Sequence, residues 1–245
     1  VAIVAHRGAS AYAPENTLSA ENLAWEMNAD AVEIDVHLTK DGRVIVCHDG
    51  TTQRTAGVEM KISDATSEAL RKLDVGSFKG EKFAGEKLPF LEEVIATVPK
   101  GKKLFIEIKC GAEVLPELKR VVLAGGKMDQ MVIIGFGLDT MIEAKKVLPQ
   151  LPVYWLRGTL KDEKTGKFLP HDPALLVQAK EGNLDGVDMN YWGIDKAFAD
   201  AAKAAGLELH AWTVDDPAEG KRLVGLGVDS ITTNKPDLFE LKPGE

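Results

Sequence analysis

The chain has 245 residues, of which 44% are hydrophobic and 28% charged, and this balance is typical of a globular protein with a substantial core. Its formal net charge of -8 argues against a nucleic acid as partner, because nucleic-acid-binding proteins usually present a basic surface to the phosphate backbone. No apolar run approaches the roughly 20 residues that cross a bilayer, so we expect a soluble protein with no stable membrane insertion, with the cytoplasm slightly favoured over the periplasm or secretion.

The first predicted element is an apolar strand over residues 1–5 that runs directly into His6 and Arg7. Burying such side chains is costly, so a strand that ends on them either exposes them at a sheet edge or directs them at a polar site. The spacing of the apolar residues that follow predicts an amphipathic helix over 16–27.

A hairpin comes next in the chain. Strand patterns over 31–39 and 43–49 flank an Asp-Gly pair, which predicts a strand, a tight turn and a returning strand. From 50 to 87 the periodicity weakens, apart from one short helix near 64–73. We interpret 50–87 as an insertion that lies over one face of the main fold.

Beyond residue 87, strand patterns alternate regularly with helix patterns. Helices are predicted near 90–98, 112–124, 138–147, 173–181, 194–205 and 216–225, and strands near 102–109, 130–136, 152–158, 184–190, 207–213 and 229–233. Without the returning strand the chain has eight strands of the parallel type, which predicts an α/β fold, a TIM (β/α)8 barrel with a small insertion after the second strand. We expect one domain over residues 1–245. An open doubly wound sheet is the alternative, but no glycine-rich dinucleotide fingerprint follows the first strand.

Polar side chains are frequent at the ends of the predicted strands. The active site of a TIM barrel lies at the carboxyl ends of its strands, so these side chains are expected to share one mouth. They are His6, Arg7, Glu33, Asp35, Glu107, Lys109, His210, Trp212 and Asn234.

Three carboxylates converge in this arrangement. Glu33 and Asp35 are two residues apart on one strand, so they point to the same side. Glu107 and Lys109 have the same spacing on the next strand. Uncompensated carboxylates raise one another's pKa and repel, so one divalent cation with oxygen ligands, Mg²⁺ or Ca²⁺, is the expected cofactor. The alternative is a set of salt bridges with Lys109, Arg7 and other cations at the mouth.

Two histidines are available for acid and base catalysis. His6 closes the first strand and His48 ends the returning strand. His6 alone is equally well explained as a core histidine, but a pair supplies a general base and a general acid at one pH, which suits displacement at phosphorus or carbon. Arg7 and Lys109 are then candidates to bind phosphate oxygens and to stabilise charge in the transition state.

Taken in order, these motifs resemble the glycerophosphodiester phosphodiesterase family. The match covers nearly the whole chain and includes AHRGASAYAPENTLSA, VEIDVHLTKDGRVIVCHD, LDVGSFKG, GEKLPFLEEV, FIEIK, HAWTVDD and GVDSITTNKP. The resemblance implies a TIM barrel with 50–87 as the small insertion of the family. It also implies the hydrolysis of glycerophosphodiesters, such as glycerophosphocholine or glycerophosphoethanolamine, to glycerol 3-phosphate and an alcohol.

The resemblance also implies roles for individual residues. His6 and His48 match the catalytic acid and base. Glu33, Asp35 and Glu107 match the metal ligands. The substrate-binding residues are matched by Arg7, Lys109 and Trp212, with the glycerol end packed on the tryptophan.

Three further features of the sequence concern the same mouth. Gly135 precedes Phe136 where Ser-Phe is common in the family, and Asn234 stands where aspartate is common. A long, Lys-rich stretch over 158–172 is a candidate lid, with a solvated surface loop as the alternative.

Other functions fit parts of the same residue set. Metal-assisted proton abstraction beside a carboxylate would use Lys109 as the base, but it leaves His6 and Arg7 unexplained. A noncatalytic phosphate-binding barrel needs no pair of histidines. A lysophospholipid is the nearer rival substrate, but the sequence has no evident amphipathic membrane element. The expected partner is a small-molecule glycerophosphodiester, and neither the alcohol headgroup nor the oligomeric state follows from the sequence.

Overall fold

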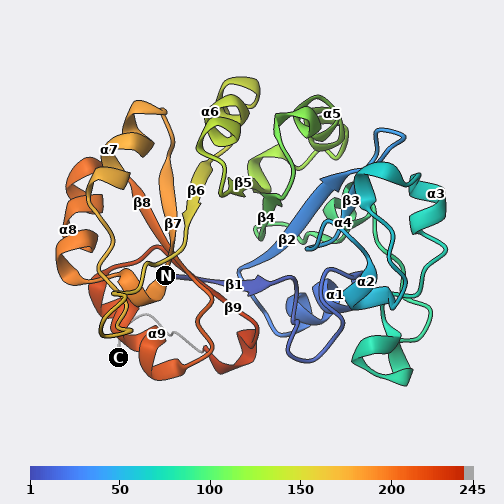
Figure 1. Cartoon of the computed structure of the whole chain (residues 1–245), viewed down its shortest axis with the longest axis horizontal. Coiled ribbons are helices and arrows are strands. Elements are labelled where there is room, and N and C mark those ends of the chain that lie inside the picture. The colour runs from blue at the N-terminus through green and yellow to red at the C-terminus, as the bar shows by residue number, and fades with distance from the viewer. Residues whose placement is uncertain (240–245) are drawn as a thin grey trace.

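Eight parallel strands form a closed barrel in the computed structural model, which describes residues 1–239 (Figure 1). The barrel closes because β1 (Ala2–His6) pairs with β2 (Ala31–Leu38) on one side and with β9 (Ser230–Thr233) on the other. The other parallel strands, each hydrogen-bonded to the next, are β4 (Lys103–Ile108), β5 (Met131–Gly135), β6 (Val153–Arg157), β7 (Gly186–Asn190) and β8 (Glu208–Trp212). A short strand, β3 (Val44–Val46), returns antiparallel to β2. The predicted TIM barrel is confirmed, and the open doubly wound sheet is wrong.

Helices connect the parallel strands and surround the barrel (Figure 1). They are α1 (Leu18–Glu26), α4 (Leu91–Thr97), α5 (Leu115–Ala124), α6 (Leu138–Val147), α7 (Ala174–Glu181), α8 (Lys196–Ala205) and α9 (Pro217–Leu226), each close to its predicted range. Thr17, Asp195 and Asp216 cap α1, α8 and α9 by accepting a hydrogen bond from the backbone of the first turn. None of the helices between residues 1 and 239 has both the length and the apolar character that crossing a bilayer requires.

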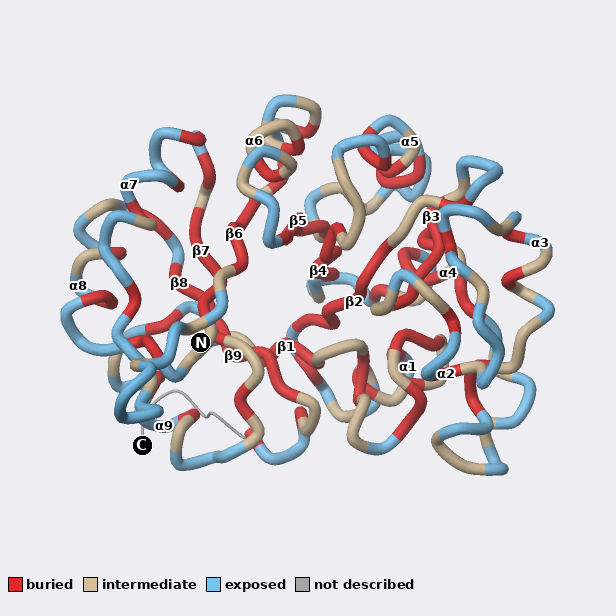
Figure 2. The backbone as a smooth tube through the Cα atoms, in the orientation of Figure 1, coloured by how far each residue is buried: buried red, intermediate tan, exposed pale blue. Residues whose placement is uncertain are grey.

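The alternation of side chains along the strands separates the inside of the barrel from its helix-covered outside. On β2, Val32 and Ile34 belong to the apolar layer between strands and helices, whereas Glu33 and Asp35 point the other way. Figure 2 shows the strands as almost continuously buried. The apolar filling of the barrel itself is a separate cluster of Val4, Ala31, Phe105, Val132, Ile134, Tyr154 and Leu156. Inward positions beyond this cluster, toward the carboxyl ends of the strands, are therefore free for polar side chains.

The segment 50–87 lies beside β2 and β3, outside the barrel (Figure 1). It contains the short helices α2 (Gln53–Ala56) and α3 (Ser67–Leu70) and 3-10 turns at Ile62–Asp64, Ser77–Lys79 and Glu81–Phe83. Its apolar side chains share a small core with β3, formed by Ile45, Cys47, Ile62, Leu70, Val75 and Leu88. The insertion thus packs directly behind the returning strand that leads to His48.

The tight turn after β1 depends on a glycine. Arg7 and Gly8 have φ angles of 56° and 77°, and a Cβ on Gly8 would lie 2.5 Å from the carbonyl carbon of Ala20. We expect Gly8→Ala to lower the free energy of unfolding by about 3 kcal/mol, because left-handed strain and a backbone clash add. Gly126→Ala, at φ 67° with open space around it, is the matched control and should cost only about 1–2 kcal/mol. Urea denaturation measures the free energy of unfolding of both variants. Equal losses in the two would contradict the contribution of the clash with Ala20.

Candidate active site

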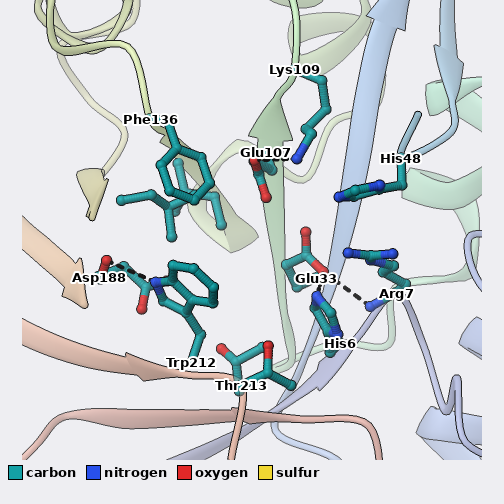
Figure 3. A pocket seen from close by; sticks show the side chains of 13 residues that line it. His6, Arg7, Glu33, His48, Glu107, Lys109, Phe136, Asp188, Trp212 and Thr213 are labelled. Atoms are coloured by element: carbon teal, nitrogen blue, oxygen red, sulfur yellow. Dashed lines mark hydrogen bonds and ion pairs between the residues drawn. The ribbon is translucent and has the colours of Figure 1, made fainter. Parts of the chain in front are cut away.

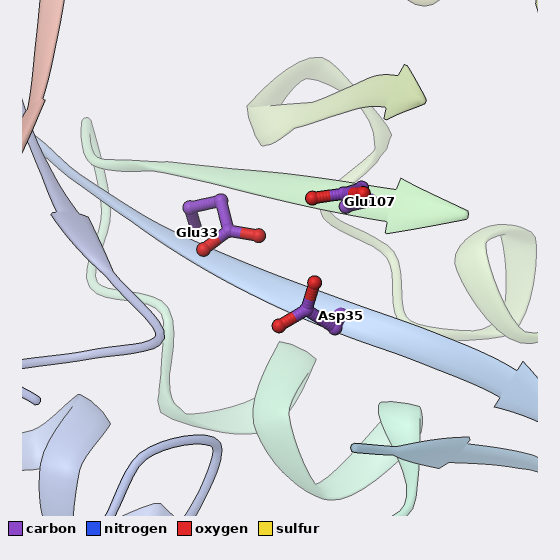
Figure 4. A group of neighbouring side chains, drawn as sticks. All are labelled: Glu33, Asp35 and Glu107. Carbon is purple, nitrogen blue, oxygen red and sulfur yellow. The ribbon is translucent and has the colours of Figure 1, made fainter. Parts of the chain in front are cut away.

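Glu33, Asp35 and Glu107 meet at the carboxyl end of the barrel (Figure 4). Glu33 and Asp35 come from β2, and the strand register sets Asp35 directly beside Glu107 of β4. All three residues are buried, and each offers a carboxylate oxygen that lies within 4.8 Å of the other two. The predicted convergence of the three carboxylates is therefore present in the folded chain.

The charges of this carboxylate cluster are only partly compensated by the protein. Burial, together with repulsion from Asp35, raises the pKa of Glu33 well above its ordinary value and that of Glu107 to about 7. Lys109 Nζ lies 2.8 Å from Glu107 Oε1 and 3.6 Å from Asp35 Oδ1, and Arg7 Nε lies 3.3 Å from Asp35 Oδ2.

Salt bridges alone leave part of the cluster unsatisfied. Oε1 of Glu33 and Oδ1 of Asp35 are buried without a hydrogen-bond partner among residues 1–239. Unpaired carboxylate oxygens that face one another are the donor set that a hard divalent cation takes, so the residues fit such an ion. The salt-bridge alternative accounts for Lys109, for Arg7 and, through the ion pair at 3.6 Å with Lys109, for Asp35 Oδ1, but it leaves Glu33 Oε1 without a partner among residues 1–239.

Residues of the β1–α1 connection hold this cluster in position. Asn16 donates from Nδ2 to Asp35 Oδ2 at 2.8 Å and accepts from the Asp35 backbone N–H at 3.2 Å. The backbone N–H of Arg7 donates to Glu33 Oε2 at 3.0 Å. Arg7 and Asn16 both have positive φ angles, of 56° and 57°, so the turn is strained where it meets the carboxylates. The sequence pattern predicts Asn16 within the helix over 16–27, whereas α1 begins at Leu18 with Thr17 as its cap, and Asn16 binds Asp35 instead.

His6 is fixed by a chain of hydrogen bonds through residues that follow β9 and β8. Its Nδ1 donates to Asn234 Oδ1 at 2.7 Å, and Asn234 Nδ2 donates to Asp215 Oδ2 at 2.7 Å. This leaves Nε2 on the pocket side, 4.0 Å from Glu33 Oε2. Burial, and then the charge of Arg7, lower the pKa of His6 to about 4. Asn234, one of the departures from the family pattern, is thus the residue that sets the orientation of this imidazole.

His48 is fixed from the insertion. Its Nδ1 donates to Asp49 Oδ1 at 2.6 Å, and Asp49 Oδ2 accepts from Arg54 Nε at 2.7 Å. The Arg54 guanidinium also donates twice to Glu15, at 2.8 and 2.7 Å, and Glu15 accepts from Arg7 Nη1 at 2.9 Å. The prediction that His48 ends the returning strand is wrong, because β3 stops at Val46 and His48 lies in the bend that follows.

A pocket of about 140 Å³ joins these groups (Figure 3). Its lining residues are His6, Arg7, Glu33, His48, Glu107, Lys109, Ile134, Phe136, Leu156, Asp188, Trp212, Thr213 and Thr232. His6, Arg7 and His48 lie on one side, whereas Trp212, Phe136 and Asp188 lie on the other (Figure 3). Phe136 and Trp212 pack edge to face with their ring centroids 5.6 Å apart. The pocket therefore has a charged half and a largely apolar half.

His210 does not belong to this pocket, so its predicted place at the mouth is wrong. Its ring stacks on Tyr154 with centroids 4.1 Å apart, and its Nδ1 lies 2.7 Å from Ser230 Oγ. It lines a separate hollow that Val1 and Asp30 also line, at the amino-terminal ends of the strands. Side chains two residues apart on a strand both point inward but lie in successive layers, so Trp212 reaches the mouth and His210 does not.

The loop over 158–172 contributes no residue to the lining of this pocket. Thr159 Oγ1 donates to Asn190 Oδ1 at 2.9 Å, and Phe168 stacks on Trp192 with centroids 4.7 Å apart. The loop is therefore attached to the segment after β7. Gly135, the other departure from the family pattern, faces Met141, whose Cε would lie 2.7 Å from an added Cβ.

The comparisons with known proteins agree on one family. The family model for the glycerophosphoryl diester phosphodiesterase family matches residues 6–238. A glycerophosphodiester phosphodiesterase of Caldanaerobacter subterraneus subsp. tengcongensis is 36% identical over 96% of this chain and 94% of its own length. An Oleispira antarctica phosphodiesterase, solved in complex with the product sn-glycerol-3-phosphate, is similar with a TM-score of 0.87 and 26% identity, covering 97% of this chain and 94% of that one. A glycerophosphodiester phosphodiesterase of Thermotoga maritima has a TM-score of 0.77 and 26% identity, with 98% and 96% covered. The chain therefore belongs to the glycerophosphoryl diester phosphodiesterase family of enzymes.

Proposed function

We propose that the chain hydrolyses glycerophosphodiesters, such as glycerophosphocholine or glycerophosphoethanolamine, to glycerol 3-phosphate and an alcohol. The observation that carries this proposal is the pocket in which three carboxylates, two cationic side chains and two separately anchored histidines meet. We also propose that residues 1–245 form one domain, with 50–87 as an insertion, because β1 pairs with both β2 and β9 and the segment 50–87 packs on β3.

The proposed metal ligands are Glu33, Asp35 and Glu107. Their oxygen donors suit either Mg²⁺ or Ca²⁺, and within residues 1–239 Glu33 Oε1 and Asp35 Oδ1 are buried without a hydrogen bond. When bound, such a cation neutralises charge on the phosphoryl oxygens and makes the phosphorus more electrophilic.

Arg7 and Lys109 are the proposed phosphate-binding residues. Both line the pocket from the side of the carboxylates. A guanidinium and an ammonium there donate to the nonbridging oxygens and stabilise the charge that these oxygens carry in the transition state. Glu15, which accepts from Arg7 Nη1 at 2.9 Å, keeps the guanidinium in place.

His6 and His48 are the proposed acid and base. Each has its Nδ1 engaged, with Asn234 and with Asp49 respectively, which leaves Nε2 for proton transfer. One histidine removes the proton of the attacking hydroxyl, and the other protonates the departing alcohol. Attack by water gives glycerol 3-phosphate directly, whereas attack by the glycerol 2-hydroxyl gives a transient cyclic phosphate that water then opens to glycerol 3-phosphate. In-line attack requires the two groups on opposite sides of the phosphorus, which two histidines from different elements can provide.

Incubation with glycerophosphocholine tests the proposal. The protein is supplied with Mg²⁺ or Ca²⁺, with and without a chelator, and glycerol 3-phosphate is measured with a coupled dehydrogenase. We expect glycerol 3-phosphate to appear and the chelator to abolish it. Its absence with every metal would contradict the proposal and favour proton abstraction beside a carboxylate or simple phosphate binding. Release of choline from a lysophospholipid at a higher rate would move the substrate class to lysophospholipids.

Arg54 should affect catalysis although it does not line the pocket. It is hydrogen-bonded to both Asp49 and Glu15, the partners of His48 and Arg7. We expect Arg54→Ala to lower kcat/KM for glycerophosphocholine roughly tenfold, as is typical for residues that orient catalytic groups. The control is Arg120→Ala, which removes an exposed ion pair with Glu117 on α5. Equal activities of the two variants would contradict a positioning role for Arg54.

A further inference from the structure

We propose that Asp188 is a specificity-determining residue whose carboxylate accepts a hydrogen bond from a hydroxyl of the glycerol end of the substrate. This inference rests on the proposed function and assigns a contact on the apolar half of the pocket, opposite the phosphate-binding groups. Sequence reasoning missed Asp188, because a single aspartate inside a strand pattern has no spacing that distinguishes it.

Asp188 is buried without any hydrogen bond to its side chain. It lies on β7, is 1% exposed and lines the pocket next to Trp212. No residue between 1 and 239 donates to its carboxylate, and its Oδ1 is fully buried. The backbone carbonyl of Asp188 accepts from Trp212 Nε1 at 3.1 Å, so the carboxylate stays free while the main chain fixes the indole (Figure 3).

A structural role does not account for this carboxylate. Its register neighbour on β8 is His210, whose Nδ1 lies 2.7 Å from Ser230 Oγ and whose Nε2 lies 3.4 Å from Glu208. Its neighbour on β6 is the apolar Leu156. A polar group in such surroundings destabilises the fold unless something donates to it, and an apolar side chain would pack there at lower cost. Burial raises the pKa of Asp188 to about 7 although the nearby His210 opposes this shift, and no hydrogen bond within residues 1–239 stabilises the carboxylate.

The chemistry of this half of the pocket favours a hydroxyl that is attached to a short carbon chain. Trp212, Phe136 and Leu156 offer apolar surface to C–H groups, and Asp188 offers the acceptor. Glycerol supplies both features. A trimethylammonium group can oppose the charge of the carboxylate but has no N–H to donate, so it leaves the buried acceptor without a hydrogen bond, whereas a hydroxyl or a primary ammonium supplies one. The glycerol end of the substrate is therefore the occupant that we assign to this half.

Calorimetric titration with phosphate monoesters tests the inference without turnover. The Mg²⁺-loaded wild type and Asp188→Ala are titrated with glycerol 3-phosphate, with phosphoethanolamine, and with propyl phosphate, which lacks both hydroxyls. We expect Asp188→Ala to weaken glycerol 3-phosphate roughly tenfold or more while propyl phosphate stays within about twofold. Asp188→Asn, of the same size, should give a smaller loss, and the exposed Asp200→Ala serves as the unaffected control.

Three outcomes would overturn the inference. They are an equal loss of affinity for glycerol 3-phosphate and propyl phosphate, no loss of affinity for either, and a loss confined to phosphoethanolamine. The last outcome would assign the carboxylate to an ammonium headgroup. If Asp188→Ala does not fold, Asp188→Asn decides by the same comparison. A wild type that prefers glycerol 3-phosphate to propyl phosphate but releases none from glycerophosphocholine would contradict the proposed function and leave the hydroxyl contact standing.

Discussion

His6→Ala and His48→Ala are each expected to lower kcat for glycerophosphocholine by roughly 10²-fold or more, because each removes one of the two proposed proton-transfer groups. The two imidazoles are anchored by different partners, Asn234 and Asp49, so loss of one leaves the other in place. The measurement is steady-state kinetics at saturating metal, with metal binding to each variant checked by calorimetry.

The matched control for these variants is His171→Ala. His171 is a buried histidine that is hydrogen-bonded to the backbone carbonyl of Asn190 and does not line the pocket. Its replacement should leave kcat of the folded protein within about twofold, which is the spread expected for a residue that touches no reacting group. Near-normal kcat in His6→Ala or His48→Ala, with metal bound, would remove that histidine from the mechanism.

Glu107→Gln is expected to lower kcat and metal affinity by at least about 10²-fold, since even residues that only orient metal ligands cost 10–100-fold. The same substitution should stabilise the metal-free protein, because it replaces a carboxylate that burial and Asp35 disfavour. Thermal unfolding with and without Mg²⁺ measures both effects. If the cluster served only as salt bridges, the loss of Glu107 would destabilise the metal-free protein by leaving Lys109 without its nearest partner.

The sign of the pH dependence follows from the same group. The folded-state pKa of Glu107 is raised from 4.5 to about 7, so the folded metal-free protein binds more protons than the unfolded chain between these values. Its free energy of unfolding should therefore be greatest below pH 4.5 for this group and fall as the pH rises through 7. Glu107→Gln should flatten this dependence. An unchanged slope in the variant would show that the carboxyl does not titrate in this range.

The barrel could be predicted from the sequence because the alternation of residues along a strand indicates which of its faces packs against the helices. On β2, apolar Val32 and Ile34 alternate with Glu33 and Asp35, and the next parallel strand repeats the pattern with Glu107. Parallel pairing then brings the carboxylates together at the same end. The carboxylate cluster could therefore be predicted from the alternation of side chains along each strand and from the pairing of parallel strands in the closed barrel.

The partners of the site residues could not be predicted in the same way. Arg54 acts from a short helix in the insertion, and Asn234 reaches His6 from the other end of the chain. Such contacts depend on how loops fold over the barrel, which no periodicity describes. The position of an inward side chain along the barrel axis is equally hard to predict, because it depends on the stagger between neighbouring strands. For this reason His210 was expected at the mouth, although it lies nearer the amino-terminal ends of the strands.

The central claim is that Glu33, Asp35 and Glu107 would hold one cation in the pocket that His6 and His48 also line. A crystal structure grown with Mn²⁺ and glycerol 3-phosphate tests it through the anomalous scattering of the metal. We predict one anomalous peak bonded to oxygens of the three carboxylates, with the phosphate within reach of both imidazoles. A peak elsewhere, or a phosphate that contacts only one histidine, would contradict the account.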